Sequence, residues 1–421
     1  ASPNEYFQAQ RRPRYQEVAK QLVESGHGYY CYCSEERLQE RRATQKARNA
    51  PPGYDRRCRT FGPAERAEAA AACEAEGRPP VIRLAVPLEG QTTVHDAVRG
   101  DTTFENRSLE DLILLKSDGL PTYHLGHLVD DHDMQISHVM RADEYLPTFP
   151  LHILIHQALD WETPVYVHLP LILDPSGKGK LSKRKQNPDG TVTENTYPTM
   201  ISEFRALGYL PEAFVNFIAL QGWSVAPDRD LATLEEMIEK FDLHEIKKSP
   251  AAINFEKLEH MNGHYIRQLP VDDLAEHVAP FLEKAGLPTE RERLRAVLPL
   301  VQERMRLLSE APALLDFFLA DAPPPNVAEL PAKGMDNATT RQALQRTREA
   351  LAAGEWTLEA IDQTLRSLAS ELGLKAGQLF QPIRVAITGR LQAPGIFETV
   401  YHIGREPVLV RLDQAIQLLS E

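Results

Sequence analysis

A short basic loop offers the clearest chemistry in the chain. Residues 177–186 include five Lys or Arg and no Asp or Glu, and two glycines, Gly177 and Gly179, precede Lys180. The loop follows an apolar run, residues 167–173, that is typical of a buried strand. Glycines allow backbone movement and lysines supply point charges, so the loop suits phosphates on which charge develops during a reaction. A solvated basic loop is the alternative.

Seven segments in collinear order resemble the glutamyl-tRNA synthetases of bacterial type, a family of class I aminoacyl-tRNA synthetases. The basic loop contains Lys180-Leu181-Ser182-Lys183-Arg184, which is similar to the second signature of that class. Six weaker stretches match the same family: Pro121–His124, Val129–Met134, His138–Glu144, Gly208–Ala213, Met261–Ile266, and Arg384–Arg390 with Pro394-Gly395. Each is weak alone, but six in the right order leave little room for chance.

The resemblance implies a multidomain fold, α/β followed by all-α, in which a class I Rossmann-type parallel sheet carries the loop. The expected divisions are the end of the first sheet half, an inserted α+β acceptor-binding module, the second sheet half, a stem-contact domain, and two subdomains of a helical anticodon-binding half. These correspond to residues 1–24, 25–118, 119–186, 187–268, 269–320 and 321–421.

Hydrophobic periodicity predicts the helices and strands that carry these residues. Spacings of three and four predict helices over 12–24, 34–48 (beginning at Ser34), 63–76 and 150–159, and a largely helical chain after residue 200, with a cap at Thr357. Alternation predicts strands over 81–86, 92–96, 122–129, 135–140 and 166–173. Because a helix lies between the last two strands, they are expected to run parallel.

Glutamate selection needs a cation in a partly buried pocket. Arg141 suits this, because its planar fork can pair with a carboxylate through two hydrogen bonds, and Tyr123 can add a hydroxyl. In the family, residues at these positions contact the amino acid, and the resemblance places Glu144 and Tyr145 beside the substrates. The alternative is that Arg141 pairs structurally with Asp143 or Glu144.

The resemblance assigns ATP, with Mg²⁺, to Lys180 and Lys183 as the catalytic residues, with Ser182 beside them. The family's first signature, His-Ile-Gly-His or a variant, lies upstream of where this chain begins. The tetrapeptide His124–His127 has similar letters but is expected to be a structural strand, because it runs into Leu128-Val129 and lies only 56 residues before Lys180.

A structural zinc is suggested by Cys31-x-Cys33 and the later Cys58, since two thiolates one residue apart plus a third suit a tetrahedral ion. Zinc-bearing relatives add a His two residues after the third Cys or a Tyr four residues before it. Thr60, a poor ligand, occupies the first place and Tyr54 the second. Cys73 is a further candidate, and buried free thiols are the alternative.

Nucleic acid is not excluded by the formal net charge of −13, because charge acts locally. Residues 11–66 carry 13 Lys or Arg against 7 Asp or Glu. The resemblance implies that the basic helix around residues 37–48 receives the acceptor end, and that Arg304, Arg384 and Pro394 contact the anticodon of tRNA(Glu). A solvated Arg304 is the alternative.

The expected function is therefore ATP-dependent attachment of glutamate to tRNA(Glu) through glutamyl-adenylate. Four cysteines and the lack of a long apolar run favour a cytoplasmic protein that does not span a membrane, and we expect a monomer. Because the first signature is not in the chain, a non-catalytic tRNA-binding fragment or half of a split enzyme stays open, and we expect the chain alone to bind tRNA without charging it. A glutaminyl enzyme, or one that glutamylates a tRNA base, is disfavoured by the helical C-terminal half.

Overall fold

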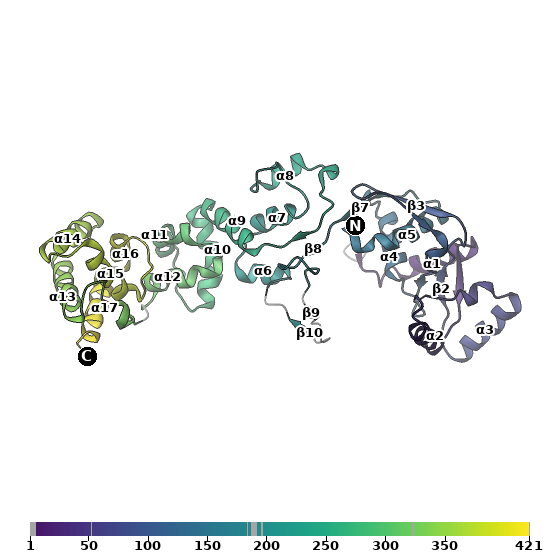
Figure 1. Ribbon diagram of the computed structural model, residues 1–421, viewed down its shortest axis with the longest axis horizontal. Helices are drawn as coiled ribbons and strands as arrows, with labels where there is room; N and C mark the ends of the chain where they lie inside the picture. The colour runs from purple at the N-terminus through teal and green to yellow at the C-terminus, as the bar shows by residue number, and fades with distance from the viewer. Residues whose placement is uncertain are drawn as a thin grey trace. The chain divides into compact units, whose positions relative to one another are not determined.

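The computed structural model divides into two compact units. The N-terminal unit comprises Ala1–Ile172 with Phe241–Ala251, and the C-terminal unit comprises Leu173–Lys240 with Ala252–Glu421 (Figure 1). The structure describes residues 6–51, 53–182, 184–186, 192–194, 197–321 and 324–420. None of the helices in these ranges combines the length and apolarity that a membrane crossing requires.

Two sheets build the N-terminal unit, with strand orders β1-β2-β5 and β4-β3-β7-β6. The first sheet is antiparallel, whereas β6 and β7 of the second run parallel, which confirms the predicted strand–helix–strand crossover. In that pair Arg141 lies opposite His168. The strands are β1 (Gly28–Cys31), β2 (Val81–Leu84), β3 (Gln91–Asp96), β4 (Gly100–Glu105), β5 (Ile113–Leu115), β6 (His138–Ala142) and β7 (Val165–Leu169).

Helices cover these sheets and supply much of the core. The fully buried residues Tyr15, Val18 and Leu22 of α1 join one apolar cluster with residues of α4 and α5. The Ser34 side chain caps α2 by accepting the Arg37 N–H, as the sequence predicted. The helices are α1 (Arg12–Glu24), α2 (Glu35–Ala47), α3 (Pro63–Ala75), α4 (Tyr123–Asp133) and α5 (Phe149–Ala158).

The strand predicted over residues 122–129 is wrong, because this segment forms α4. Its buried residues Leu125, Leu128 and Val129 recur at spacings of three and four, which is the helical period. The tetrapeptide His124–His127 is therefore not a strand, since it lies at the start of a helix that follows β5. What these histidines do has to be judged from their contacts.

Two other expected strands differ in extent. The run 166–173 is divided into β7 and β8 (Ile172–Leu173) on either side of Pro170, which has no backbone N–H to donate to a ladder. The strand expected from residue 135 begins at His138, because Gln135 adopts a left-handed backbone with φ +56° that closes α4.

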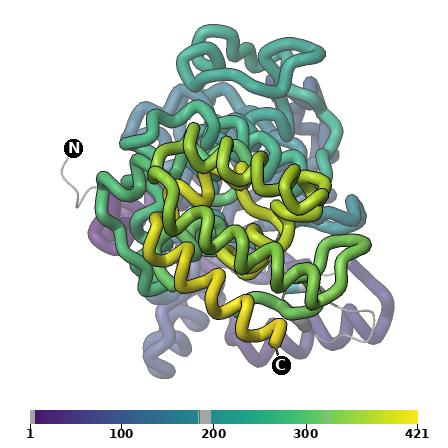
Figure 2. Tube along the Cα trace, turned by 90° about the vertical axis from the view of Figure 1, so that its left-hand side faces the viewer, coloured from purple at the N-terminus to yellow at the C-terminus, as the bar shows by residue number. Residues whose placement is uncertain are grey.

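The C-terminal unit is helical, as predicted, and one large apolar cluster runs through it. Helix α13 packs on α17, and α14 packs on α16, in the layered bundle that faces the viewer in Figure 2. Thr357 caps α14 by accepting the Ala360 N–H, which confirms the predicted helix start. The helices are α6 (Ile201–Leu207), α7 (Pro211–Ala219), α8 (Leu234–Lys240), α9 (Phe255–Gln268), α10 (Val271–Lys284), α11 (Arg291–Val301), α12 (Ala311–Leu319), α13 (Asn337–Ala353), α14 (Leu358–Glu371), α15 (Ala376–Thr388), α16 (Ile396–Ile403) and α17 (Arg405–Leu418), and the short strands are β9 (Arg184–Gln186) and β10 (Val192–Glu194). Strand β11 (Ala251–Ala252) lies at the boundary between the two units.

Asn262 on α9 ties three backbone segments of this unit together. Its Oδ1 accepts the Leu210 N–H at 2.7 Å, and its Nδ2 donates to the carbonyls of Arg306 at 2.6 Å and Gly208 at 3.3 Å. The side chain is fully buried, so removing it leaves those groups without partners.

We predict that Asn262→Ala lowers the free energy of unfolding of the C-terminal unit by about 2–4 kcal/mol, whereas Asn337→Ala, at an exposed position, changes it by less than about 0.5 kcal/mol. Denaturant unfolding followed by circular dichroism measures both. Equal stability of the two variants would refute the bracing role of Asn262.

Candidate functional site

Arg141 lies at the centre of a cluster of polar side chains in the N-terminal unit. It belongs to β6 and is partly buried. Its Nε donates to His168 Nε2 at 3.0 Å, one terminal nitrogen lies 3.1 Å from His152 Nδ1, and the other donates to the Tyr123 hydroxyl at 3.2 Å. The guanidinium also lies near the rings of Tyr145 and Tyr166, at 5.3 and 5.2 Å from the ring centroids. These contacts fix the plane of the guanidinium.

His168, on β7, is fully buried and is itself bound to a buried carboxylate. Its Nδ1 lies 2.6 Å from Asp96 Oδ2 at the end of β3. Burial acts to raise the pKa of Asp96, but hydrogen bonds from His168 and from the N–H groups of Arg99 and Val98 outweigh it, so that the pKa is lowered. Asp96 is therefore an anion, linked through His168 to Arg141.

Four histidines from α4 and α5, His124, His127, His152 and His156, surround the contact between Arg141 and His152 or lie farther along α5, and three of them are held uncharged. His124 Nδ1 lies 3.0 Å from His152 Nε2, and His127 Nε2 lies 3.5 Å from the same atom. Burial, followed by the charges of His127 and Arg141, lowers the pKa of His124 to about 4 and lowers that of His152 well below its ordinary range. Burial, with a smaller effect of His127, lowers the pKa of His156 to about 4.

The other predicted contacts of the amino acid lie near this cluster. Tyr123, the first residue of α4, is 46 % exposed, and its ring centroid lies 5.2 Å from that of Tyr145. Glu144 is exposed. Asp143, one of the carboxylates that could have paired with Arg141, instead pairs with Arg99 at 2.6 Å. The structural pairing of Arg141 with Asp143 is thus not observed.

The arrangement suits the binding of a carboxylate. Arg141 has five N–H groups, and three of them are directed at His168, His152 and Tyr123. Within the described residues the acceptors of Arg141 are all uncharged, so none of them balances the positive charge of the guanidinium. Two of its N–H groups are left for a ligand. A side-chain carboxylate that accepts both would supply the missing negative charge.

The basic loop belongs to the C-terminal unit. The backbone of Leu173 forms a bridge with Lys180, and Asp174 and Gly179 share a hydrogen bond of 2.7 Å, so the loop is a tight turn with Gly177 at φ +70°. Lys178 is exposed within the turn, and Lys180 is exposed where the turn closes. The Ser182 hydroxyl donates to the Arg184 carbonyl at 3.1 Å. Lys183 lies outside the described residues.

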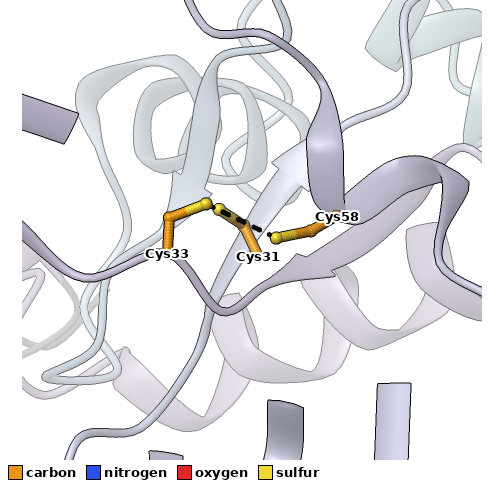
Figure 3. Close-up of side chains that lie close together, drawn as sticks. All are labelled: Cys31, Cys33 and Cys58. Atoms are coloured by element: carbon orange, nitrogen blue, oxygen red, sulfur yellow. Dashed lines mark hydrogen bonds between the residues drawn. The ribbon is translucent and has the colours of Figure 1, made fainter. Parts of the chain in front are cut away.

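Three cysteines of the N-terminal unit point toward one another (Figure 3). The Sγ atoms of Cys31, Cys33 and Cys58 all lie within 4.8 Å of one another, with Cys33 and Cys58 at 3.5 Å. The Tyr54 hydroxyl lies 3.3 Å from Cys31 Sγ and 3.5 Å from Cys33 Sγ. Hydrogen bonds from the other two thiols lower the pKa of Cys31, whereas the hydrogen bond with Cys31 raises the pKa of Cys33 and burial raises that of Tyr54, so Cys31 is the first of these groups to lose its proton. Cys73 is buried and directs its thiol at the Tyr32 carbonyl, 3.7 Å away.

These four donors fit a tetrahedral metal. A zinc ion with Zn–S bonds of about 2.3 Å separates its sulfur ligands by about 3.8 Å, close to the distances in the cluster. N–H groups already point at the sulfurs: Arg37 donates to Cys33 Sγ at 3.3 Å, and the Tyr32 backbone donates to Cys58 Sγ at 3.4 Å. Such bonds favour thiolates, the form that binds metal.

The predicted tRNA contacts lie on other surfaces of the two units. In the C-terminal unit Arg304 is exposed, Pro394 is buried, and the Nε of Arg384 is buried without a hydrogen-bond partner among the described residues. Burial and the charge of Arg304 lower the pKa of Arg384. On α2 of the N-terminal unit, Arg42 and Lys46 are exposed.

The structure brings Tyr123 and Arg141 together as predicted but also adds residues that sequence reasoning missed. These are Asp96, His152 and His168. The pairing of Arg141 with His168 follows from the register of β6 and β7, which the length of the crossover does not determine. The only signal in the sequence was a polar His within an apolar run.

Comparison with known proteins gives the same picture over the whole chain. The family model "tRNA synthetases class I (E and Q), catalytic domain" matches residues 2–260, and "Anticodon binding domain" matches residues 273–416. A glutamate–tRNA ligase of Moorella thermoacetica is 41% identical over 99% of this chain and 83% of its own length, and one of Roseiflexus sp. is 44% identical over 96% and 79%. A crystal structure of a glutamate tRNA ligase from Elizabethkingia meningosepticum, in complex with its amino acid, has a TM-score of 0.80 at 28% identity and covers 100% of this chain and 84% of that one.

The histidine cluster predicts how stability depends on pH. His124 and His156 titrate near 6.5 when unfolded but at about 4 when folded, so between these values the unfolded chain binds more protons. Stability therefore falls as the pH is lowered from 6.5 toward 4. We expect His124→Gln/His156→Gln to lose less melting temperature than the wild type between pH 7 and pH 5, by about 2–4 °C for each kcal/mol of lost linkage.

Scanning calorimetry at the two pH values measures this, with His95→Gln as the control because the His95 side chain is 76% exposed. An identical pH dependence in the double variant and the wild type would show that these histidines are not buried as neutral groups.

Proposed function

The chain belongs to the glutamate–tRNA ligases, within the class I tRNA synthetases for glutamate and glutamine, and we propose that it attaches glutamate to tRNA in protein synthesis. ATP activates the α-carboxylate of glutamate to glutamyl-adenylate with release of pyrophosphate. The glutamyl group then passes to the terminal adenosine of the tRNA. Neither step needs a covalent enzyme nucleophile, and Mg²⁺ accompanies the ATP.

The observation that carries this proposal is that Arg141, among the described residues, contacts neutral acceptors and no carboxylate, while the Asp96 anion is reached only through His168. The acceptors His168, His152 and Tyr123 are neutral, so an anionic side chain is the ligand that balances the site. We assign the glutamate γ-carboxylate to Arg141 and Tyr123. Tyr145 and Glu144 then lie beside the bound substrates.

ATP binding is assigned to the basic loop of the C-terminal unit. Lys180 and Lys183 would stabilise the charge that develops on the phosphates, and Ser182 would add a hydroxyl donor. The tight turn at Gly177 and the exposure of Lys180 support this assignment. Removing one preorganised contact of this kind typically costs about 2.7–4 kcal/mol of transition-state stabilisation.

Contacts with tRNA(Glu) are assigned to both units. Arg304, Arg384 and the turn at Pro394 would contact the anticodon, and α2 would meet the acceptor end. The proximity of the Arg304 and Arg384 charges, with one buried nitrogen that has no hydrogen-bond partner in the part of the chain that the structure describes, supports an anionic or acceptor-rich ligand there. Residues 25–118 would form the acceptor-binding module and residues 269–421 the anticodon-binding half. We further expect a cytoplasmic monomer.

A structural zinc is assigned to Cys31, Cys33, Cys58 and Tyr54. The close approach of their donor atoms supports it, and so do the N–H groups aimed at two of the sulfurs. The ion would tie β1 to the segment that carries Tyr54 and Cys58 and would do no chemistry on the substrates. Buried free thiols are the competing assignment.

We predict that Arg141→Gln raises the KM for glutamate about 10- to 100-fold, because charge-assisted hydrogen bonds to the γ-carboxylate are lost. The KM for ATP should change by no more than about threefold, since Arg141 is not assigned to ATP. The measurement is aminoacylation of tRNA(Glu) with Mg-ATP, together with glutamate binding by calorimetry. Arg107→Gln, which alters an exposed arginine of the same unit, is the control. An unchanged affinity for glutamate would remove Arg141 from the site.

We also predict about one zinc per chain after gentle purification. Cys58→Ser should lose most of the metal, whereas Cys73→Ser should keep it, because Cys73 is equally buried but lies outside the cluster. Elemental analysis of the three proteins decides the matter. Full zinc content in Cys58→Ser, or no zinc in the wild type, would favour free thiols.

A further inference from the structure

We propose that Asp96 and His168 are positioning residues that set the orientation of Arg141 and, through it, the preference for a glutamate side chain over a glutamine side chain. Asp96 lies at the end of β3 and His168 lies on β7, so neither belongs to the strand that carries Arg141. The inference rests on the proposed function and extends it to residues that do not touch the substrate.

The first step is the tautomer of His168. The Asp96 carboxylate can only accept, so His168 Nδ1, 2.6 Å from Asp96 Oδ2, carries the hydrogen. In the neutral ring Nε2 then has a free lone pair, and this atom lies 3.0 Å from Arg141 Nε. A hydrogen on Nε2 would face the Arg141 N–H, donor against donor. The observed geometry therefore requires the Nδ1–H tautomer.

The second step is the rigidity of Asp96. Its Oδ1 accepts the backbone N–H groups of Val98 at 2.9 Å and Arg99 at 2.7 Å, and its Oδ2 accepts the backbone N–H of His168 at 3.0 Å as well as the ring. The side chains of Asp96 and His168 are both 0% exposed. With four donors around it and no exposed side-chain surface, the carboxylate is held in one orientation, so the backbone fixes the tautomer of His168.

The fixed orientation of the guanidinium determines the selectivity for a carboxylate over a carboxamide. With Nε held by His168, and with His152 and Tyr123 on the terminal nitrogens, the guanidinium cannot turn and only its two remaining N–H groups face a ligand. A carboxylate accepts from both donors. A carboxamide presents one oxygen and one NH₂, and the NH₂ would face a donor. A freely rotating arginine could avoid that clash, so rejection of the amide depends on the fixed plane.

The test uses Asp96→Asn. Its amide NH₂ must face either the two backbone N–H groups of Val98 and Arg99 or the side occupied by His168. The first choice opposes two backbone N–H groups, whereas the second opposes one, that of His168, because the His168 ring can move its hydrogen to Nε2. That hydrogen then opposes Arg141, a side chain that can yield where a backbone N–H cannot. We expect ¹⁵N histidine NMR to show the Nδ1–H tautomer in the wild type and the Nε2–H tautomer in Asp96→Asn, with the His168 signal assigned by its loss in His168→Gln.

For the same variant, glutamate affinity should fall about tenfold or more, the KM for ATP should stay within about threefold, and the ratio of kcat/KM for glutamate to that for glutamine should drop. Asp101→Asn is the matched control: it makes the same change in an exposed Asp–His pair, Asp101 with His95 at 2.8 Å, on the same β-hairpin. It should alter none of these values.

A second variant separates positioning from a loss of folding. His168→Gln places an amide oxygen where Nε2 was, so it can accept from Arg141 without help from Asp96. In the His168→Gln variant, Asp96→Asn should lower the affinity for glutamate by less than about threefold. The effects of the two substitutions are then non-additive. Equal costs in both backgrounds, an Nε2–H tautomer in the wild type, or an unchanged affinity in Asp96→Asn would overturn the proposal. A wild type with the Nδ1–H tautomer that binds no glutamate would instead contradict the proposed function.

Discussion

A partly buried guanidinium that has no carboxylate partner among the described residues constrains the rest of the N-terminal unit. Arg141 donates to two histidines and a tyrosine, and within the described residues all three are uncharged. A partly buried charge raises the free energy of the folded state unless a counter-ion binds beside it. Other contacts therefore have to order the side chains around Arg141. The side chains around Arg141 are therefore ordered by their own hydrogen bonds, which is the arrangement that the proposed carboxylate site needs.

The surrounding elements supply that order. The parallel register of β6 and β7 sets His168 opposite Arg141, and the end of β3 brings in Asp96. Helix α5 contributes His152 from a fully buried position. Because burial keeps this histidine neutral, it accepts from Arg141 rather than repelling it. Asp96 also lies within residues 25–118, which we proposed as the acceptor-binding module, so a buried contact joins that stretch to Arg141 through His168.

Much of this fold could be predicted from local patterns, and the exceptions have physical reasons. The helices α1, α2 and α3 were predicted within a residue or two of their ends, because caps and periodicity are local. Helix α4 was mistaken for a strand, since its histidines interrupt a short apolar pattern that suits either period. Arg141, Tyr123 and the three cysteines could be named because their chemistry is visible in the sequence. Asp96, His152 and His168 could not, because strand register and long-range packing bring them to Arg141.

The proposed site depends on the assignment of a side-chain carboxylate to Arg141. A crystal structure of the chain with bound glutamate tests this assignment most directly. We predict that the γ-carboxylate accepts hydrogen bonds from the terminal nitrogens of Arg141 and lies near Tyr123, while the bond from Arg141 Nε to His168 Nε2 stays near 3.0 Å. A structure in which Arg141 instead binds the α-carboxylate of glutamate, or turns away from His168 to pair with an acidic side chain, would contradict the account.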